Sequence, residues 1–139
     1  MFNKSLFRHA GLPVVAAGML LLAGCASMET GKPEDIVAKR AQAFWNARAV
    51  GQADKAYALT LPSYRNGRPL EQVQRSFGNA FAIKGVTVVN VTCEVEKCTA
   101  RTRLDVNPAL AGIKVGTIAT HFDEIWLLED GQWWRHQDL

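Results

Sequence analysis

Residues 117–136 of this 139-residue chain read TIATHFDEIWLLEDGQWWRH, and this stretch decides the fold. Asp130-Gly131 favours a two-residue hairpin turn, and runs rich in β-branched and aromatic residues lie on both sides of it. Because neighbouring residues of a strand point to opposite faces, Trp133 and Trp134 must lie on opposite faces of the last strand. The stretch therefore predicts a hairpin that closes an antiparallel sheet, with a long and strongly bent first strand.

Two further strands are predicted before this hairpin. Residues 86–93 are rich in β-branched side chains, and residues 98–106 alternate between polar and apolar. A four-residue hairpin loop between them would place Cys93 opposite Cys98, at the Cα separation of about 4.5 Å that a disulfide tolerates. We predict a structural disulfide between Cys93 and Cys98, worth only about 2 kcal/mol because its loop is small.

Two other interpretations of Cys93 and Cys98 are weaker. A redox-active pair usually has two intervening residues, whereas four separate these cysteines. Half of a metal site would need His121 and His136 nearby, and nothing in the sequence places them there. We therefore predict no metal site.

The residues before the strands are typical of helices. Pro33 suits the first position of a helix, Glu34 and Asp35 complement its positive end, and Gly51 is a suitable stop. A second short helix is expected over residues 54–59.

The chain then turns before the sheet begins. Pro62 is expected to end the second helix, residues 64–68 to form a loop, and Pro69 to open a third helix that continues to Phe81. Helices followed by antiparallel strands predict an α+β domain of about three helices packed on one face of a four-stranded sheet.

The N-terminus carries a processing pattern. Lys4 and Arg8 precede an apolar run over residues 10–23, which has the length of a signal-peptide core and is too short to span a bilayer. At the end of this run, Leu22-Ala23-Gly24-Cys25 resembles the lipobox of bacterial lipoproteins. That resemblance implies cleavage before Cys25 and its acylation as an N-acyl diglyceride cysteine carrying fatty acids such as palmitate.

The expected organisation is a signal peptide over residues 1–24, a lipidated tether over residues 25–32, and a single α+β domain over residues 33–139. An uncleaved anchor helix or an ordinary signal peptide is the alternative. Ala26 after the cysteine, rather than Asp, resembles the pattern sent to the outer membrane, so we expect the domain at its periplasmic face.

Removing the leader changes the charge and the cysteine count. The formal charge of +3 includes Lys4 and Arg8, so the mature chain has 14 basic side chains (16 − 2) against 13 acidic ones. A near-neutral domain gives no electrostatic reason to bind nucleic acid. Lipid on Cys25 leaves two of the three cysteines to pair.

Two stretches carry a resemblance to a known family. One is Ala41-Gln42-Ala43-Phe44-Trp45-Asn46-Ala47 followed by Gly51 and Ala56-Tyr57-Ala58-Leu59; the other is Glu124-Ile125-Trp126-Leu127-Leu128 before the Asp130-Gly131 turn. Together with the order of elements, they resemble the nuclear transport factor 2-like superfamily, a cystatin-like cone. The resemblance implies helices that cover the concave side of a curved sheet. Its members include isomerases, dehydratases and binding domains, so it implies a pocket and not a reaction.

An acid–base pair for such a pocket is available on the long strand. His121 and Asp123 fall on one face of it and could orient each other for proton transfer. Phe122 and Trp126 fall on the other face together with Glu124, and the sequence does not say which face is concave. His136 is expected at the surface or the rim.

Several aromatic residues are candidates for a pocket or an interface, although core packing explains them equally: Tyr57, Tyr64, Trp126, Trp133 and Trp134. No phosphate-binding loop, nucleophile elbow or cofactor motif occurs, and we predict no cofactor.

The sequence thus predicts a membrane-anchored module of the cell envelope that binds a small apolar ligand or an envelope protein. An isomerase or dehydratase that uses His121 and Asp123 is one alternative. A structural or assembly component is the other.

Overall fold

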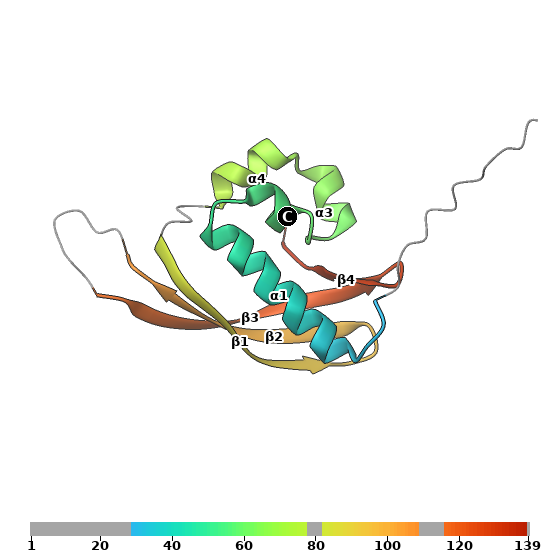
Figure 1. Cartoon of the computed structure of the whole chain (residues 1–139). Helices are drawn as coiled ribbons and strands as arrows, with labels where there is room; N and C mark the ends of the chain where they lie inside the picture. Colours follow the sequence, from blue (N-terminus) through green and yellow to red (C-terminus); the bar gives the residue numbers. More distant parts are fainter. Residues whose placement is uncertain (1–28, 78–81, 109–115, 139) are drawn as a thin grey trace, which may run out of the picture.

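The computed structural model describes residues 29–77, 82–108 and 116–138, which form four helices followed by a four-stranded antiparallel sheet (Figure 1). This confirms the predicted α+β class. The predicted leader and lipobox lie outside the described residues, as does Phe81. Among the helices described, none combines the length and apolar character needed to cross a membrane.

The first helix, α1 (Pro33–Ala49), begins and ends as the sequence predicts. Pro33 is at its N-terminus, and Glu34 and Asp35 are in its first turn. At its other end Gly51 has a φ of +76°, which glycine adopts at no steric cost. Gln52 N–H donates to the Ala47 carbonyl and Gly51 N–H to the Arg48 carbonyl, the pairing of a Schellman motif.

Three short helices follow: α2 (Ala53–Tyr57), α3 (Pro62–Gly67) and α4 (Leu70–Ser76). The predicted loop over residues 64–68 is therefore wrong. Pro62 opens α3 and does not end α2, which stops at Tyr57, and Tyr64 buries its ring against Leu61 and Val73. The Tyr57 hydroxyl donates to the Arg65 carbonyl at 3.0 Å, so a tertiary contact supports this turn of helix.

The sheet has the order β1-β2-β3-β4, formed by β1 (Ile83–Cys93), β2 (Lys97–Val106), β3 (Ile118–Glu129) and β4 (Gln132–Arg135). Asp130 and Gly131 have φ of 52° and 74°, as a type I′ hairpin turn requires, which confirms the predicted closing turn. β1 starts before the predicted position, and a bulge at Val89 shifts its register against β2.

The outer edge of β4 is covered by the segment between α2 and α3. Leu61 N–H donates to the Arg135 carbonyl at 3.1 Å, and Arg135 N–H donates to the Leu59 carbonyl at 2.9 Å. Thr60 between them is fully buried. The chain thereby satisfies an edge that would otherwise expose unpaired backbone groups.

One face of the sheet is covered by α1, which lies across it and starts beside the hairpin turns (Figure 1). Alternate β2 residues are buried or exposed, so one set faces the helix and the other faces outward. The side chains that form the core come from α1, from α2 and from this inner face: Val37, Ala41, Phe44, Trp45, Ala47, Ala56, Cys98, Ala100, Leu104, Trp126 and Trp133.

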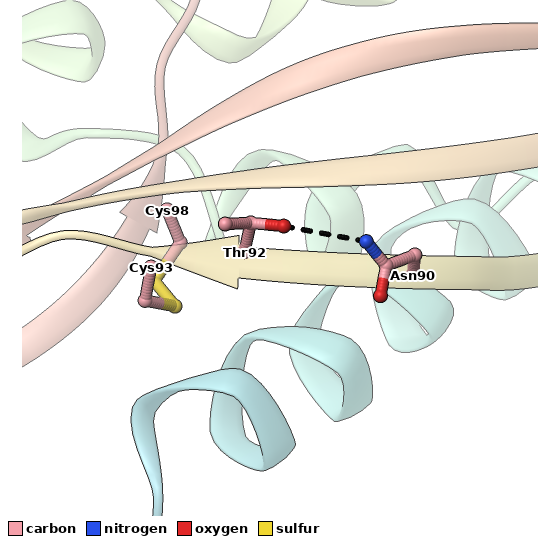
Figure 2. Close-up of a disulfide and its surroundings, with 4 residues drawn as sticks. All are labelled: Asn90, Thr92, Cys93 and Cys98. Carbon is pink, nitrogen blue, oxygen red and sulfur yellow. Dashed lines mark hydrogen bonds between the residues drawn. A yellow bond between two sulfur atoms is a disulfide. The ribbon is translucent and has the colours of Figure 1, made fainter.

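The predicted disulfide is present. Cys93 and Cys98 face each other across the β1–β2 hairpin with their Cα atoms 4.0 Å apart, and their sulfur atoms are bonded (Figure 2). Cys98 is fully buried in the core, so the bridge joins the end of the hairpin to the packed interior. Among the described residues no group of three His, Cys, Asp or Glu could hold a metal ion.

Candidate functional site

The structure places the predicted acid–base pair on the outer face of the sheet. His121 is exposed, and the Asp123 side chain is 52% exposed. Asp123 accepts a hydrogen bond from Arg101 on the facing strand at 3.0 Å, so its polar partner is an arginine rather than His121. The pair thus lacks the enclosed setting that the proton-transfer hypothesis requires.

The next residue, Glu124, is on the inner face and is buried, with 2% of its side chain exposed. Three side chains donate to its carboxylate. Thr102 Oγ1 donates to Oε1 at 3.0 Å, Trp45 Nε1 donates to Oε2 at 3.1 Å, and Arg135 Nε donates to Oε2 at 2.8 Å. Both oxygens are therefore engaged, as a buried carboxylate requires.

Four elements bring this cluster together. Trp45 comes from α1, Thr102 from β2, Glu124 from β3 and Arg135 from β4. We name these four residues the Glu124 cluster. The sequence carried one signal for it, because Glu124 falls among the apolar inner positions of β3, but its partners are as far as 79 residues away and were not predicted.

The charge of Arg135 is compensated by a carboxylate and by aromatic rings. Its side chain is only 13% exposed, and it pairs with Glu124. Its guanidinium carbon also lies 4.4 Å from the ring centre of Phe44 and 5.6 Å from that of Trp45. A charge this buried is tolerated because the opposite charge and the aromatic faces replace the water it loses.

A second arginine, Arg48, lies at the C-terminal end of α1. Its guanidinium carbon is 4.2 Å from the ring centre of Phe77 and 5.2 Å from that of Trp45, and its Nη2 donates to the Phe77 carbonyl. Burial, and to a smaller extent the like charge of Arg135, lower the pKa of Arg48 to about 10. No Asp or Glu side chain pairs with it, although all thirteen are among the described residues.

Most of the aromatic candidates are part of the protein interior. Trp126 is fully buried and Trp133 is 4% exposed, both in the main core, and Tyr64 is buried in a second cluster. Tyr57 is half-buried and donates to backbone carbonyls. These four residues therefore support the fold, and Tyr64 also lines a small hollow.

The fifth aromatic candidate, Trp134, is only partly buried. As predicted, it lies on the opposite face from Trp133, but it is half-buried, and the guanidinium groups of Arg40 and Arg65 lie 5.1 and 4.9 Å from its ring centre. Its Nε1 donates to the Glu129 carbonyl at 3.2 Å. Neither tryptophan of β4 is therefore an exposed anchor for a partner.

Two hollows lined by described residues lie beside the C-terminal segment. The larger, of about 340 Å³, lies where the chain leaves β4, and its walls include Asp123, Glu124, Arg135 and His136. The smaller, of about 150 Å³, is formed by residues of α3 and the same C-terminal segment. His136, predicted at a rim, lines both of them.

Comparison of the sequence with models of protein families and with curated proteins gives no match. Several solved structures have a fold similar to that of this chain. TsrD from Streptomyces laurentii has a TM-score of 0.53 at 21% identity, over 78% of this chain and 90% of that one. A SEC-C motif containing protein from Rhodopseudomonas palustris has a TM-score of 0.52 at 14% identity, over 67% of this chain and 69% of that one.

A candidate NTF2-like transpeptidase from Campylobacter jejuni has a TM-score of 0.50 at 11% identity, over 70% of this chain and 94% of that one. At such identities the likeness shows the fold alone. The fold is nuclear transport factor 2-like. This confirms the architecture that the two sequence stretches implied.

Proposed function

We propose that the protein is a lipid-anchored module of the cell envelope that binds a small ligand at the inner face of its sheet. The observation that carries the binding part is the Glu124 cluster. The carboxylate inside the curved sheet accepts three hydrogen bonds and holds an arginine and a tryptophan in place. A group engaged in this way supports the wall of a binding site and is poorly placed to act as a general base.

The anchor is supported by the sequence and by where the folded domain begins. Helix α1 starts at Pro33, only eight residues after the predicted acylated Cys25. A flexible chain of that length has an r.m.s. reach of about 15 Å. The domain would therefore stay close to the membrane that holds the lipid.

The direction of α1 then orients the domain. Its first turn lies beside the hairpin turns of the sheet, and its last turn lies toward the opposite end (Figure 1). A 17-residue helix is about 25 Å long. With the tether attached to the first turn, the end of α1 that carries Arg48 would face the periplasm, where a soluble ligand can reach it.

The anchor is tested with Cys25→Ser in the full-length chain, with Cys93 and Cys98 retained. The expected result is that wild-type protein has the intact mass of a triacylated chain starting at Cys25 and sediments with outer-membrane vesicles. The variant should retain its leader or leave the membrane fraction. A wild-type protein that carries no acyl chains by intact mass would overturn the anchor.

A control separates anchoring from folding. Ser27→Ala, two residues further along the tether, leaves the lipobox unchanged and should fractionate as wild type. Circular dichroism of Cys25→Ser should show the same helix and strand content as wild type. A loss of membrane association that also occurs in Ser27→Ala would show that the tether, and not the acylated cysteine, is responsible.

A further inference from the structure

We propose that Arg48 is the anchoring cation of a binding site for a small organic carboxylate with an apolar body. This inference names the ligand class for the binding part of the proposed function and rests on it, but it is independent of the lipid anchor. Its basis is the difference between Arg48 and the other arginines that are held against aromatic rings.

The guanidinium of Arg48 is held in a fixed position. It lies over the rings of Phe77 and Trp45, at 4.2 and 5.2 Å, and one of its nitrogens donates to the Phe77 carbonyl. Its Nε is buried and has no hydrogen-bond partner among the described residues. A buried donor without a partner is costly, so a ligand oxygen that accepts from it would be stabilised.

The charge of Arg48 is also uncompensated. Glu124, the carboxylate of the inner face, is 2.8 Å from Arg135 and is fully engaged there. All thirteen acidic side chains are among the described residues, and none pairs with Arg48. The two guanidinium groups that lie over the Trp45 ring, those of Arg48 and Arg135, therefore share one carboxylate, which leaves an excess of one positive charge that matches a monoanion.

Other arginines in the chain show how such a charge is normally met. Arg40, which also comes from α1 and lies 5.1 Å from the ring centre of Trp134, pairs with Glu29 at 3.1 Å. Arg65 has no acidic partner, but its guanidinium donates to the carbonyls of Ala58 and Thr60. Arg48 has no acidic partner and donates to a single carbonyl, and its Nε, like that of Arg40, is buried without a hydrogen-bond partner.

The surroundings of Arg48 favour an apolar ligand body. Trp45 also contacts Phe122 edge to face, with ring centres 5.1 Å apart. A planar guanidinium flanked by aromatic rings binds a carboxylate by directed hydrogen bonds, and the rings accept the rest of the molecule.

The probe for this site is benzoate, a carboxylate with an apolar ring, and its comparison is benzamide, which has nearly the same shape and no charge. Full-length mature protein in detergent is titrated, and the Arg48 Nε–H resonance and tryptophan fluorescence are followed. Benzoate should shift the Nε–H resonance saturably. Benzamide should not shift it.

Variants assign the binding to the cation. Arg48→Met retains the apolar stem and should weaken benzoate binding by at least about tenfold, the loss expected for one charge-assisted hydrogen bond. Arg48→Lys keeps the charge and should retain part of the affinity. Arg40→Met removes a matched arginine from the same helix and should bind benzoate as wild type does.

Three results would overturn the proposal. The first is an Arg48 resonance that does not shift at about 20 mM benzoate, a concentration at which a millimolar site would be nearly filled. The second is equal binding of benzamide and benzoate. The third is an unchanged affinity for benzoate in a folded Arg48→Met variant. Circular dichroism establishes that the variant is folded. Any of these would leave the Cys25 anchor standing, and a failure of acylation would leave benzoate binding intact.

Discussion

Asp123 and Glu124 are neighbours in the chain, yet the sheet puts them in two different chemical environments. Asp123 is on the outer face, half in water, and pairs with Arg101, whose side chain is 51% exposed. Glu124 is on the inner face under α1 and pairs with Arg135, which is 13% exposed. Both pairs join a carboxylate and an arginine at 3.0 Å or less.

The difference between the two pairs is water, not distance. An exposed pair gains little because solvent screens both charges before and after they meet. A buried pair has already lost its hydration, so removing one partner leaves the other charge uncompensated in the interior. The inner face therefore depends on Glu124 far more than the outer face depends on Asp123, and the following predictions test that contrast.

The largest effect is expected for Glu124→Gln. The substitution keeps the shape of the side chain but leaves Arg135 buried without a counter-charge, and the free energy of unfolding should fall by about 3–5 kcal/mol. Chemical denaturation at neutral pH measures it. A companion variant, Glu124→Leu with Arg135→Met, removes both charges and should recover only the part of the loss that is due to the uncompensated charge, because Thr102 and Trp45 lose their acceptor. A loss under about 1 kcal/mol for Glu124→Gln would contradict the buried ion pair.

The next effect concerns the end of the inner face, where the disulfide closes the β1–β2 hairpin. Replacing both Cys93 and Cys98 with alanine should lower the free energy of unfolding by about 2 kcal/mol, mainly through the greater freedom of the unfolded chain. Reducing agent should destabilise wild type by a similar amount and leave the double variant unchanged. A double variant as stable as oxidised wild type would show that the disulfide makes no net contribution to the free energy of unfolding.

A smaller effect is expected on the outer face, from Asp123→Asn. Losing an exposed ion pair with Arg101 should change the free energy of unfolding by less than about 1 kcal/mol, and the change should shrink further at high salt. The measurement is the same denaturation series as for Glu124→Gln, run at low and high ionic strength. A cost equal to that of Glu124→Gln would remove the distinction between the two faces.

Local patterns were enough to predict much of the fold. Pro33 and Gly51 mark the ends of α1, Asp130-Gly131 sets the closing turn, and the spacing of Cys93 and Cys98 matches a hairpin. Each of these features is decided by neighbouring residues. The chain therefore carries them in a form that can be interpreted without knowing what packs against what.

The Glu124 cluster and α3 were not predictable in this way. Alternation along β3 separates His121 and Asp123 from Glu124, but which set is buried depends on the side that α1 covers. The turn of α3 depends on Tyr64 packing and on the Tyr57 hydroxyl. These contacts join segments that are distant in the chain or depend on how the helices pack.

The smallest effect distinguishes the two arginines of the inner face by pH. The pKa of Arg48 is lowered from its ordinary value to about 10, mainly because its charge is desolvated. The unfolded state therefore holds this proton more tightly than the folded state. Arg48 thus opposes folding below about pH 10, and this cost is relieved as the pH rises above about 10. The unfolding free energy of wild type should then rise relative to that of Arg48→Met over this range.

The comparison with Arg48→Met removes the contributions of the other groups that titrate at alkaline pH, because both proteins contain them. Below pH 10 the variant should be at least as stable as wild type, apart from the loss of the hydrogen bond to the Phe77 carbonyl. Benzoate bound to wild type should raise the pKa of Arg48, since an anion favours the charged guanidinium, and so move the rise to higher pH. If the difference in unfolding free energy between wild type and variant stays constant from pH 9 to pH 12, Arg48 is as well solvated in the folded state as in the unfolded chain. The contrast between Arg48 and Arg135 would then rest on the pairing of Arg135 with Glu124 alone.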